Sequence, residues 1–226
     1  MHILGAENIF PCVESSDAEG LLAIGGDLSS ERLLLAYRSG IFPWYEEDQP
    51  ILWWSPDPRM VLFPQRLKVS KSMRQLFNKK AFRVTYNQNF EKVIQNCAEI
   101  KREGQRGTWI TEEMISAYIQ LHQEGFATSV EVWQEEELVG GLYGIYLKEQ
   151  KIFCGESMFA KVSNASKYGF IYLVQQLERE GVKLIDCQVY TPHLESLGAE
   201  EWLLCPLRCT ECKGLGTDQT KRCRSR

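Results

Sequence analysis

The sequence predicts an α+β protein in which a small N-terminal domain precedes a larger domain with a mixed β-sheet. Three observations lead to this fold class. The 226 residues are 44% hydrophobic and 25% charged, which is enough to bury a sizeable core and excludes a disordered chain. A stretch rich in proline and tryptophan divides the chain near residue 65. Beyond it, the second half shows apolar patterns in the order strand, strand, strand, helix, strand.

Residues 1–65 are expected to form the small domain. Ser29 or Ser30 can cap a short helix that Gly40 terminates. Prolines then recur through residues 43–64, which predicts extended segments and turns at the domain junction. These prolines are Pro43, Pro50, Pro56, Pro58 and Pro64.

Residues 66–204 are expected to form the larger domain, and its first part is mainly helical. The patterns predict helices at Lys71–Lys79 and Phe90–Glu103 around a short strand at Phe82–Tyr86. Thr111 can cap a third helix, Glu112–Glu124, which ends at Gly125. These helices are interpreted as scaffold.

The second part of this domain predicts the sheet. Asn164 or Ser163 can cap a helix at Ala165–Glu180, whose apolar side chains fall on one face. The order of the elements suits a mixed sheet with one helix packed across it. The strands are expected at Thr128–Gln134, Leu138–Leu147, Lys151–Phe159 and Val182–Val189.

The charge pattern indicates one basic surface. Residues 66–107 hold 11 basic and 3 acidic residues and lie between acidic segments. Clustered positive charge suits contact with a phosphate backbone, although a charge run alone is more often a solvated helix face. No apolar run reaches the roughly 20 residues of a membrane span, and the N-terminus lacks a secretory pattern. A cytoplasmic protein with reduced thiols is therefore expected.

Residues 205–226 are expected to form an atypical, basic, cysteine-rich tail. Its cysteines are Cys205, Cys209, Cys212 and Cys223. Four cysteines can ligate zinc, but the irregular gaps and Pro206 argue against a compact zinc knuckle. A reading-frame change or a terminal extension explains the shift in composition better, so no metal site is predicted.

A series of motifs runs in order through residues 20–199. They include Gly-Ile-Phe-Pro-Trp-Tyr at 40–45, Leu-Trp-Trp-Ser-Pro-Asp-Pro-Arg at 52–59, Gly-Thr-Trp-Ile-Thr at 107–111, Val-Gly-Gly-Leu-Tyr-Gly at 139–144, Phe-Cys-Gly-Glu-Ser-Met-Phe at 153–159, Asn-Ala-Ser-Lys at 164–167 and Leu-Ile-Asp-Cys-Gln-Val at 184–189. In these motifs the chain resembles the leucyl/phenylalanyl-tRNA protein transferases. After Ala199 it departs from the family pattern.

The resemblance implies a fold and an activity. The C-terminal domain is expected to be similar to the acyl-CoA N-acyltransferase fold. The implied reaction moves Leu or Phe, with Met as a further candidate, from aminoacyl-tRNA to the N-terminal Arg or Lys of an acceptor protein, which marks that protein for degradation. The implied protein is a monomer. Converting an activated ester to an amide is downhill, so no metal or other cofactor is expected.

Asp186 and Gln188 are the candidate catalytic residues. Residues two apart on a strand share a face, so both are expected to point into one site while Cys187 points away. An isolated Asp-x-Gln is more often structural. The resemblance implies that Gln188 contacts the attacking amine and that Asp186 polarises it; which of the two holds the proton stays open.

Glu156 and several apolar residues are candidate substrate contacts. Glu156 interrupts an apolar strand, where an unpaired carboxylate is costly and calls for a cationic partner or an internal ion pair. The resemblance implies that it faces the basic side chain of the acceptor. The pocket for the aminoacyl side chain is implied at Leu142, Gly155, Met158 and Leu173, although each of the large ones alone is typical of a core.

Four residues are candidate contacts of the tRNA. Trp44 and Trp109 lie in segments with Gly and Pro, and the resemblance implies that they stack on the terminal adenine. Lys71 and Arg74 in the basic segment suit its phosphates.

Two other functions are compatible with parts of this sequence. An acetyl-CoA-dependent N-acetyltransferase would need a glycine-rich turn before the central helix, and residues 159–165 contain no glycine. A non-catalytic tRNA-binding module would leave Glu156, Asp186 and Gln188 unexplained.

Overall fold

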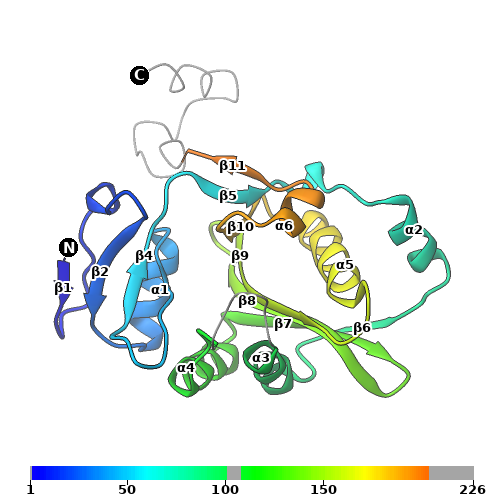
Figure 1. Ribbon diagram of the computed structural model, residues 1–226, viewed down its shortest axis with the longest axis horizontal. Helices are drawn as coiled ribbons and strands as arrows, with labels where there is room; N and C mark the ends of the chain where they lie inside the picture. Colours follow the sequence, from blue (N-terminus) through cyan, green and yellow to red (C-terminus); the bar gives the residue numbers. More distant parts are fainter. Residues whose placement is uncertain (1, 101–107, 204–226) are drawn as a thin grey trace.

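The computed structural model describes residues 2–100 and 108–203, which form a mixed α/β structure around two β-sheets (Figure 1). The smaller sheet has the strand order β1-β2-β4-β3 and lies beside helix α1 (Ser30–Arg38). Its strands are β1 (His2–Leu4), β2 (Leu21–Gly25), β3 (Phe42–Pro43) and β4 (Leu52–Trp54). A 3₁₀ turn, η1 (Val13–Ser15), lies between β1 and β2.

The expected helix in the N-terminal part is confirmed. Ser29 is its N-cap, and the Ser29 hydroxyl accepts a hydrogen bond from the Arg32 amide. The chain leaves the helix through Gly40, whose φ of 73° suits a residue without Cβ. Trp53 of β4 is fully buried, and its indole donates to the carbonyl of Gly25 at 2.8 Å.

The larger sheet has the strand order β11-β5-β10-β9-β8-β7-β6. Strand β10 runs parallel to β9, whereas the other pairs of this larger sheet are antiparallel, so the predicted mixed sheet is confirmed. The strands are β5 (Arg59–Leu62), β6 (Arg83–Tyr86), β7 (Ala127–Gln134), β8 (Glu137–Leu147), β9 (Ile152–Ala160), β10 (Leu184–Gln188) and β11 (Glu200–Trp202).

Helices cover both faces of the larger sheet (Figure 1). Helix α5 (Ala165–Arg179) packs on one face, and α3 (Phe90–Glu99) and α4 (Glu112–Gln123) pack on the other. Close packing of α5 depends on Gly140 of β8, where an added Cβ would lie 2.7 Å from the Cβ of Ala165. Three shorter elements complete the described fold: η2 (Pro64–Arg66), α2 (Lys71–Asn78) and α6 (Pro192–Ser196).

Several local predictions can be compared with these elements. Thr111 caps α4 as expected, and its hydroxyl accepts from the Met114 amide. Asn164, one of the two expected candidates, holds the N-cap position of α5, but the expected side-chain bond is absent: Asn164 has a φ of 69° and its side chain makes no capping hydrogen bond. The helix expected to reach Glu103 ends at Glu99 instead, because Ile100 already has an extended backbone with a φ of −67° and a ψ of 122°. Residues 101–107 lie outside the described residues.

The chain passes from the smaller sheet to the larger one between Trp54 and Arg59. Strand β5 therefore belongs to the larger sheet, although it precedes the boundary expected near residue 65. The reason is long-range pairing with β10 and β11, which local patterns do not contain. The cysteine-rich tail, 205–226, lies outside the described residues. In the part of the chain that is described, no helix has the length and apolar character needed to cross a membrane.

Candidate active site

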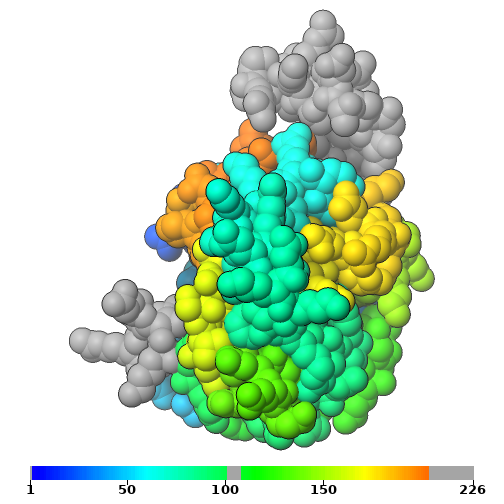
Figure 2. Space-filling model, turned by 90° about the vertical axis from the view of Figure 1, so that its right-hand side faces the viewer, coloured from blue at the N-terminus to red at the C-terminus, as the bar shows by residue number. Residues whose placement is uncertain are grey.

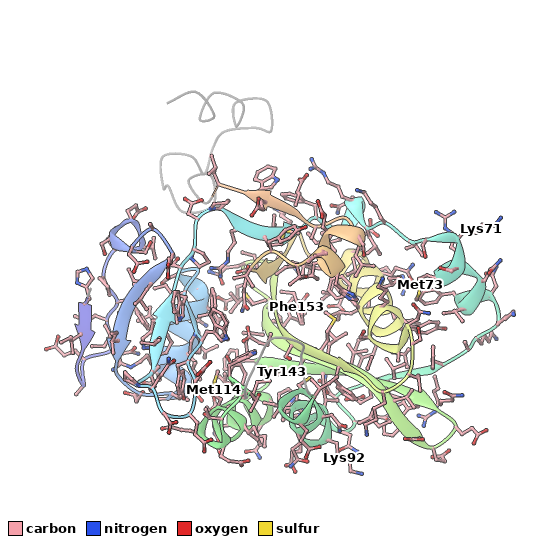
Figure 3. All side chains as sticks on the ribbon, viewed as in Figure 1. Lys71, Met73, Lys92, Met114, Tyr143 and Phe153 are labelled. Carbon is pink, nitrogen blue, oxygen red and sulfur yellow. The ribbon has the colours of Figure 1, made fainter. Side chains whose placement is uncertain are left out.

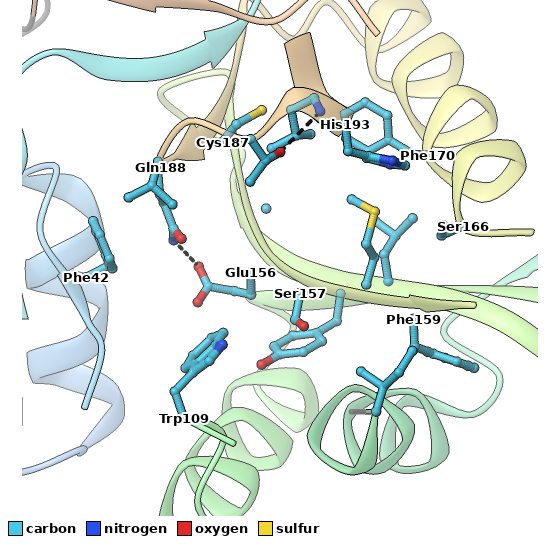
Figure 4. A pocket seen from close by; sticks show the side chains of 18 of the residues that line it. Phe42, Trp109, Glu156, Ser157, Phe159, Ser166, Phe170, Cys187, Gln188 and His193 are labelled. Atoms are coloured by element: carbon cyan, nitrogen blue, oxygen red, sulfur yellow. Dashed lines mark hydrogen bonds between the residues drawn. The ribbon is translucent and has the colours of Figure 1, made fainter. Parts of the chain in front are cut away.

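A pocket of about 490 Å³ lies between the smaller sheet and the larger sheet (Figure 4). Its size is in the range of small-molecule sites. Phe42 and Pro43 of β3 and the following Trp44 come from the smaller sheet's side, and the larger sheet, its helices and the segments that connect them contribute the rest. The walls are mainly apolar, with a few polar groups such as Glu156 and Gln188 converging on one end.

Glu156 is the central polar residue of this pocket. It lies on β9, where Oε1 accepts from the Gln188 side-chain amide at 2.8 Å and Oε2 accepts from the Tyr118 hydroxyl at 3.0 Å. The Tyr118 hydroxyl also hydrogen-bonds the hydroxyl of Tyr37, which comes from α1 beside the smaller sheet. Of the ion pairs found in residues 2–100 and 108–203, none includes Glu156. Its carboxylate therefore faces the pocket with neutral donors alone.

The surroundings shift the proton affinity of Glu156. Burial raises the pKa of this carboxyl group from 4.5 to about 7, and the charge of Asp186 adds to the rise, while the bonds from Tyr37, Tyr118 and Gln188 oppose it. Burial likewise raises the pKa of Tyr37 and of Tyr118, so both hydroxyls keep their protons at neutral pH. The site thus has a carboxyl group that titrates near neutrality.

Asp186 has a cationic partner inside the protein. Arg59 of β5 donates from Nε and Nη2 to the two carboxylate oxygens, each at 2.8 Å. The exposed fractions of the two side chains are 2% and 12%. Burial opposes the charge on Arg59, but the Asp186 carboxylate outweighs it and raises the pKa of the guanidinium. Asp186 is buried and is not one of the residues that line the pocket.

The end of β10 departs from the simple alternation that the sequence predicts. The pairing register with β5 shifts between Asp186 and Gln188, and Gln188 has a φ of 64°. Such a bulge re-aims side chains. Gln188 lines the pocket and bonds Glu156, whereas Asp186 turns to Arg59, and Cys187 also contributes to the pocket lining.

The predicted pocket residues fall into two groups. Leu142, Gly155 and Met158 line the pocket. Leu173 is buried on α5 in the same apolar cluster as Leu142, but it is not one of the residues that line the pocket. Sequence reasoning missed the lining aromatics, because apolar residues in strands and helices look like ordinary core. These aromatics are Phe42, Tyr143, Phe153, Phe159 and Phe170.

The predicted tRNA contacts lie in two separate places. Trp44 and Trp109 line the pocket, and Trp44 is 40% exposed. Lys71 and Arg74 are exposed on α2, away from the pocket (Figure 3). Figure 2, which views the right-hand side of Figure 1, shows α2 at the centre of that face. The structure therefore brings the tryptophans to Glu156 and Gln188 but leaves the two cations on a separate surface.

Three further residues at the site were missed from the sequence: Tyr37, Tyr118 and Arg59. The tyrosines carried no signal, since each lies on the apolar face of a helix. Arg59 did carry one, because a charge directly before the buried run Met60-Val61-Leu62 requires a partner.

Comparisons with known proteins identify the family. A family model described as leucyl/phenylalanyl-tRNA protein transferase matches residues 61–204, and a model of the N-terminal domain of that transferase matches residues 26–57. This chain belongs to the leucyl/phenylalanyl-tRNA protein transferase family. It is therefore an aminoacyltransferase, as the motifs predict.

Relatives with this name align along most of their length. The leucyl/phenylalanyl-tRNA protein transferase of Christiangramia forsetii is 65% identical over 201 residues, which cover 89% of this chain and 95% of that protein. The transferase of Flavobacterium johnsoniae is 64% identical, with coverage of 89% and 94%. The transferase of Syntrophobacter fumaroxidans is 56% identical over 198 residues, with coverage of 88% and 84%.

Proposed function

We propose that the pocket beside Glu156 and Gln188 is where this chain transfers Leu or Phe, with Met as a further candidate, from aminoacyl-tRNA to an acceptor protein. The acceptor begins with Arg or Lys, and the product is marked for degradation. One observation carries the proposal: an apolar pocket ends at a carboxyl group that has no cationic partner among residues 2–100 and 108–203. That combination suits an apolar aminoacyl group meeting a basic acceptor.

The chemistry of the transfer fits the orientation of Gln188. The acceptor amine attacks the ester carbonyl, the ester C–O bond breaks, and the amine loses one proton while the tRNA hydroxyl gains one. The side-chain nitrogen of Gln188 already donates to Glu156, so its carbonyl oxygen is the part that can accept from the amine. Asp186 supports Gln188 by accepting its backbone N–H at 2.9 Å.

Glu156 is proposed to bind the side chain of the acceptor's first residue. A charge-assisted bond to a guanidinium or an ammonium would supply the cation that this carboxylate lacks inside the protein. Neutral N-terminal residues would leave the carboxylate unpaired, so they would bind less well.

The apolar wall is proposed to select the aminoacyl group. Leu142, Gly155 and Met158 offer an adaptable surface on which both an aliphatic and an aromatic side chain can pack, and Leu173 belongs to the same buried cluster as Leu142. A methylene difference alone discriminates only about 10–200-fold, so rejection of β-branched residues would have to come from the shape of the wall.

The tRNA is proposed to bind at two places. Trp44 and Trp109 would stack on the terminal adenine, and Lys71 and Arg74 on α2 would contact phosphates at a distance from the pocket. Within this proposal the chain is a cytoplasmic monomer with two domains, and the boundary lies between Trp54 and Arg59 rather than at residue 65, because β5 pairs within the larger sheet. The order of strands and the helix across the sheet support an acyl-CoA N-acyltransferase-like fold for the second domain.

The test is transfer of radiolabelled Leu from Leu-tRNA to two peptides that differ only in an N-terminal Arg or Ala. Transfer to the Arg peptide without added metal or cofactor is expected, and Gln188→Ala should lower its rate while leaving tRNA affinity unchanged. Equal transfer to both peptides, or an equal loss of tRNA binding in the variant, would contradict the proposal.

A further inference from the structure

Arg59 is a buried cation that has no part in the transfer reaction as proposed so far. Its guanidinium donates hydrogen bonds to both carboxylate oxygens of Asp186. The guanidinium carbon also lies 4.7 Å from the centre of the Phe42 ring, which belongs to the smaller sheet. Two parallel hydrogen bonds fix the carboxylate in position and in orientation. Arg59 itself does not line the pocket.

Asp186, held in position by Arg59, in turn forms a hydrogen bond with the backbone of Gln188. The same oxygen that binds Arg59 Nε, Oδ1, also accepts the Gln188 N–H at 2.9 Å. Gln188 has a φ of 64°, a left-handed conformation that residues with a Cβ rarely adopt and that persists only where the surroundings hold it. The carboxylate fixed by Arg59 provides that hold.

The left-handed conformation decides where the Gln188 side chain points. It accompanies the register shift at the end of β10, and from there the Gln188 amide reaches Glu156 at 2.8 Å. In a regular strand, a shift of one residue moves a side chain to the opposite face. The direction of Gln188 therefore depends on the local bulge.

We propose that Arg59 is a positioning residue of the transfer reaction, which through Asp186 holds the turn at Gln188 and keeps the Gln188 side chain aimed into the pocket beside Glu156. The inference rests on the proposed function, in which Gln188 contacts the acceptor amine. It assigns the structural reason for the Arg at the end of the Ser-Pro-Asp-Pro-Arg motif at 55–59.

The test compares Arg59→Gln and Arg59→Lys with the unchanged chain, in single-turnover transfer of Leu from Leu-tRNA to a peptide with N-terminal Arg. Arg59→Gln should lower the transfer rate about 100-fold, because a small displacement of a reacting group is that costly. The dissociation constant for Leu-tRNA should not change. Arg59→Lys keeps the charge but cannot form the two parallel hydrogen bonds to Asp186. Its rate should therefore lie between those of the unchanged chain and Arg59→Gln.

The pH profile separates positioning from a loss of folded protein. The titratable and polar groups that interact with Glu156 are Tyr37 from α1, Tyr118 from α4, Gln188 and Asp186 from β10, Arg59 from β5 and Cys154 from β9. Without Arg59, the uncompensated charge of Asp186 would favour protonated Glu156 more strongly. The acid limb of the rate profile should therefore move to higher pH in Arg59→Gln and stay in place in Arg59→Lys.

Arg32→Gln is the matched control. Arg32 is as buried as Arg59, with its side chain 1% exposed, and it pairs with Asp27 at 3.2 Å away from the pocket. This variant should lose stability without a change in the rate per folded molecule. If Arg59→Gln does not fold, Arg59→Lys decides the matter through its rate.

Two results would overturn the inference: folded Arg59 variants with the rate and pH profile of the unchanged chain, or an equal loss of rate in Arg32→Gln. Failure of the unchanged chain to transfer Leu to the Arg peptide would instead refute the proposed function.

Discussion

At the residue scale, Glu156 is a hydrogen-bonded carboxyl group that is buried in a mainly apolar pocket. Its carboxyl group receives hydrogen bonds from Tyr118 and Gln188, yet its pKa rises to about 7 because burial disfavours the charged form. A basic side chain in the pocket would favour the ionised form. Binding of a cationic acceptor and ionisation of Glu156 are therefore coupled.

This coupling predicts how Glu156 affects stability without substrate. Between pH 4.5 and about 7, Glu156 ionises in the unfolded chain but stays protonated in the folded one, so the free energy of unfolding falls as the pH rises. Glu156→Gln removes this effect. Relative to that of the unchanged chain, the free energy of unfolding of the variant should rise by as much as about 3 kcal/mol between pH 4 and pH 8.

Denaturant unfolding of both proteins across that pH range measures the difference, and the other titrating groups cancel in the comparison. A stability difference that is constant with pH would show that Glu156 has an ordinary pKa in the folded protein.

The location of single residues at the site was predictable where a motif shared with the family contained them. Glu156, Gln188 and Trp109 were expected at the site, and the structure places all three on one pocket. Tyr118 and Arg59 were not expected, because a hydrogen bond between residues 118 and 156, or an ion pair between 59 and 186, joins positions far apart in the sequence. Alternation along β10 could not foresee the bulge at Gln188 for the same reason.

At the scale of elements, helix α2 is the surface that the proposed tRNA contact depends on. It presents Lys71 and Arg74 to solvent at some distance from the pocket (Figure 3). Its N-cap is Ser70, whose hydroxyl accepts from the Met73 amide, and Met73 anchors the helix in the core. The two cations can therefore be removed without unfolding the helix.

The double variant Lys71→Ala with Arg74→Ala should weaken binding of Leu-tRNA and flatten its dependence on salt. Each lost phosphate contact reduces the slope of log K against log salt concentration by about 1. Filter binding at several salt concentrations measures both quantities. Lys92→Ala on α3 is the control, because Lys92 lies on a different face of the molecule (Figure 3). Equal effects in the control would show that α2 holds no specific contact.

Helices and strands were more predictable than their pairing. The capped helices α1 and α4, the strands β7, β8 and β9 and the helix α5 all lie where the patterns indicate, within a few residues. The short elements β1, β11 and α6 were missed, since three to five residues carry little periodicity. The place of β5 between β11 and β10 depends on contacts across the whole chain.

At the scale of the whole molecule, the pocket belongs to both sheets. Residues 42–44 of the smaller sheet line it, and Tyr37 of α1 reaches the hydrogen bonds around Glu156. The larger sheet supplies Glu156 and Gln188 from neighbouring strands. Neither part alone encloses the site, so the family's two regions act as one structure.

The central claim is that Glu156 selects a basic acceptor in this pocket. The most direct test measures kcat/KM for transfer of Leu to matched peptides with N-terminal Arg or Ala, in the unchanged chain and in Glu156→Gln. The account predicts a strong preference for Arg in the unchanged chain and a loss of most of that preference in the variant. An unchanged preference in Glu156→Gln would contradict it.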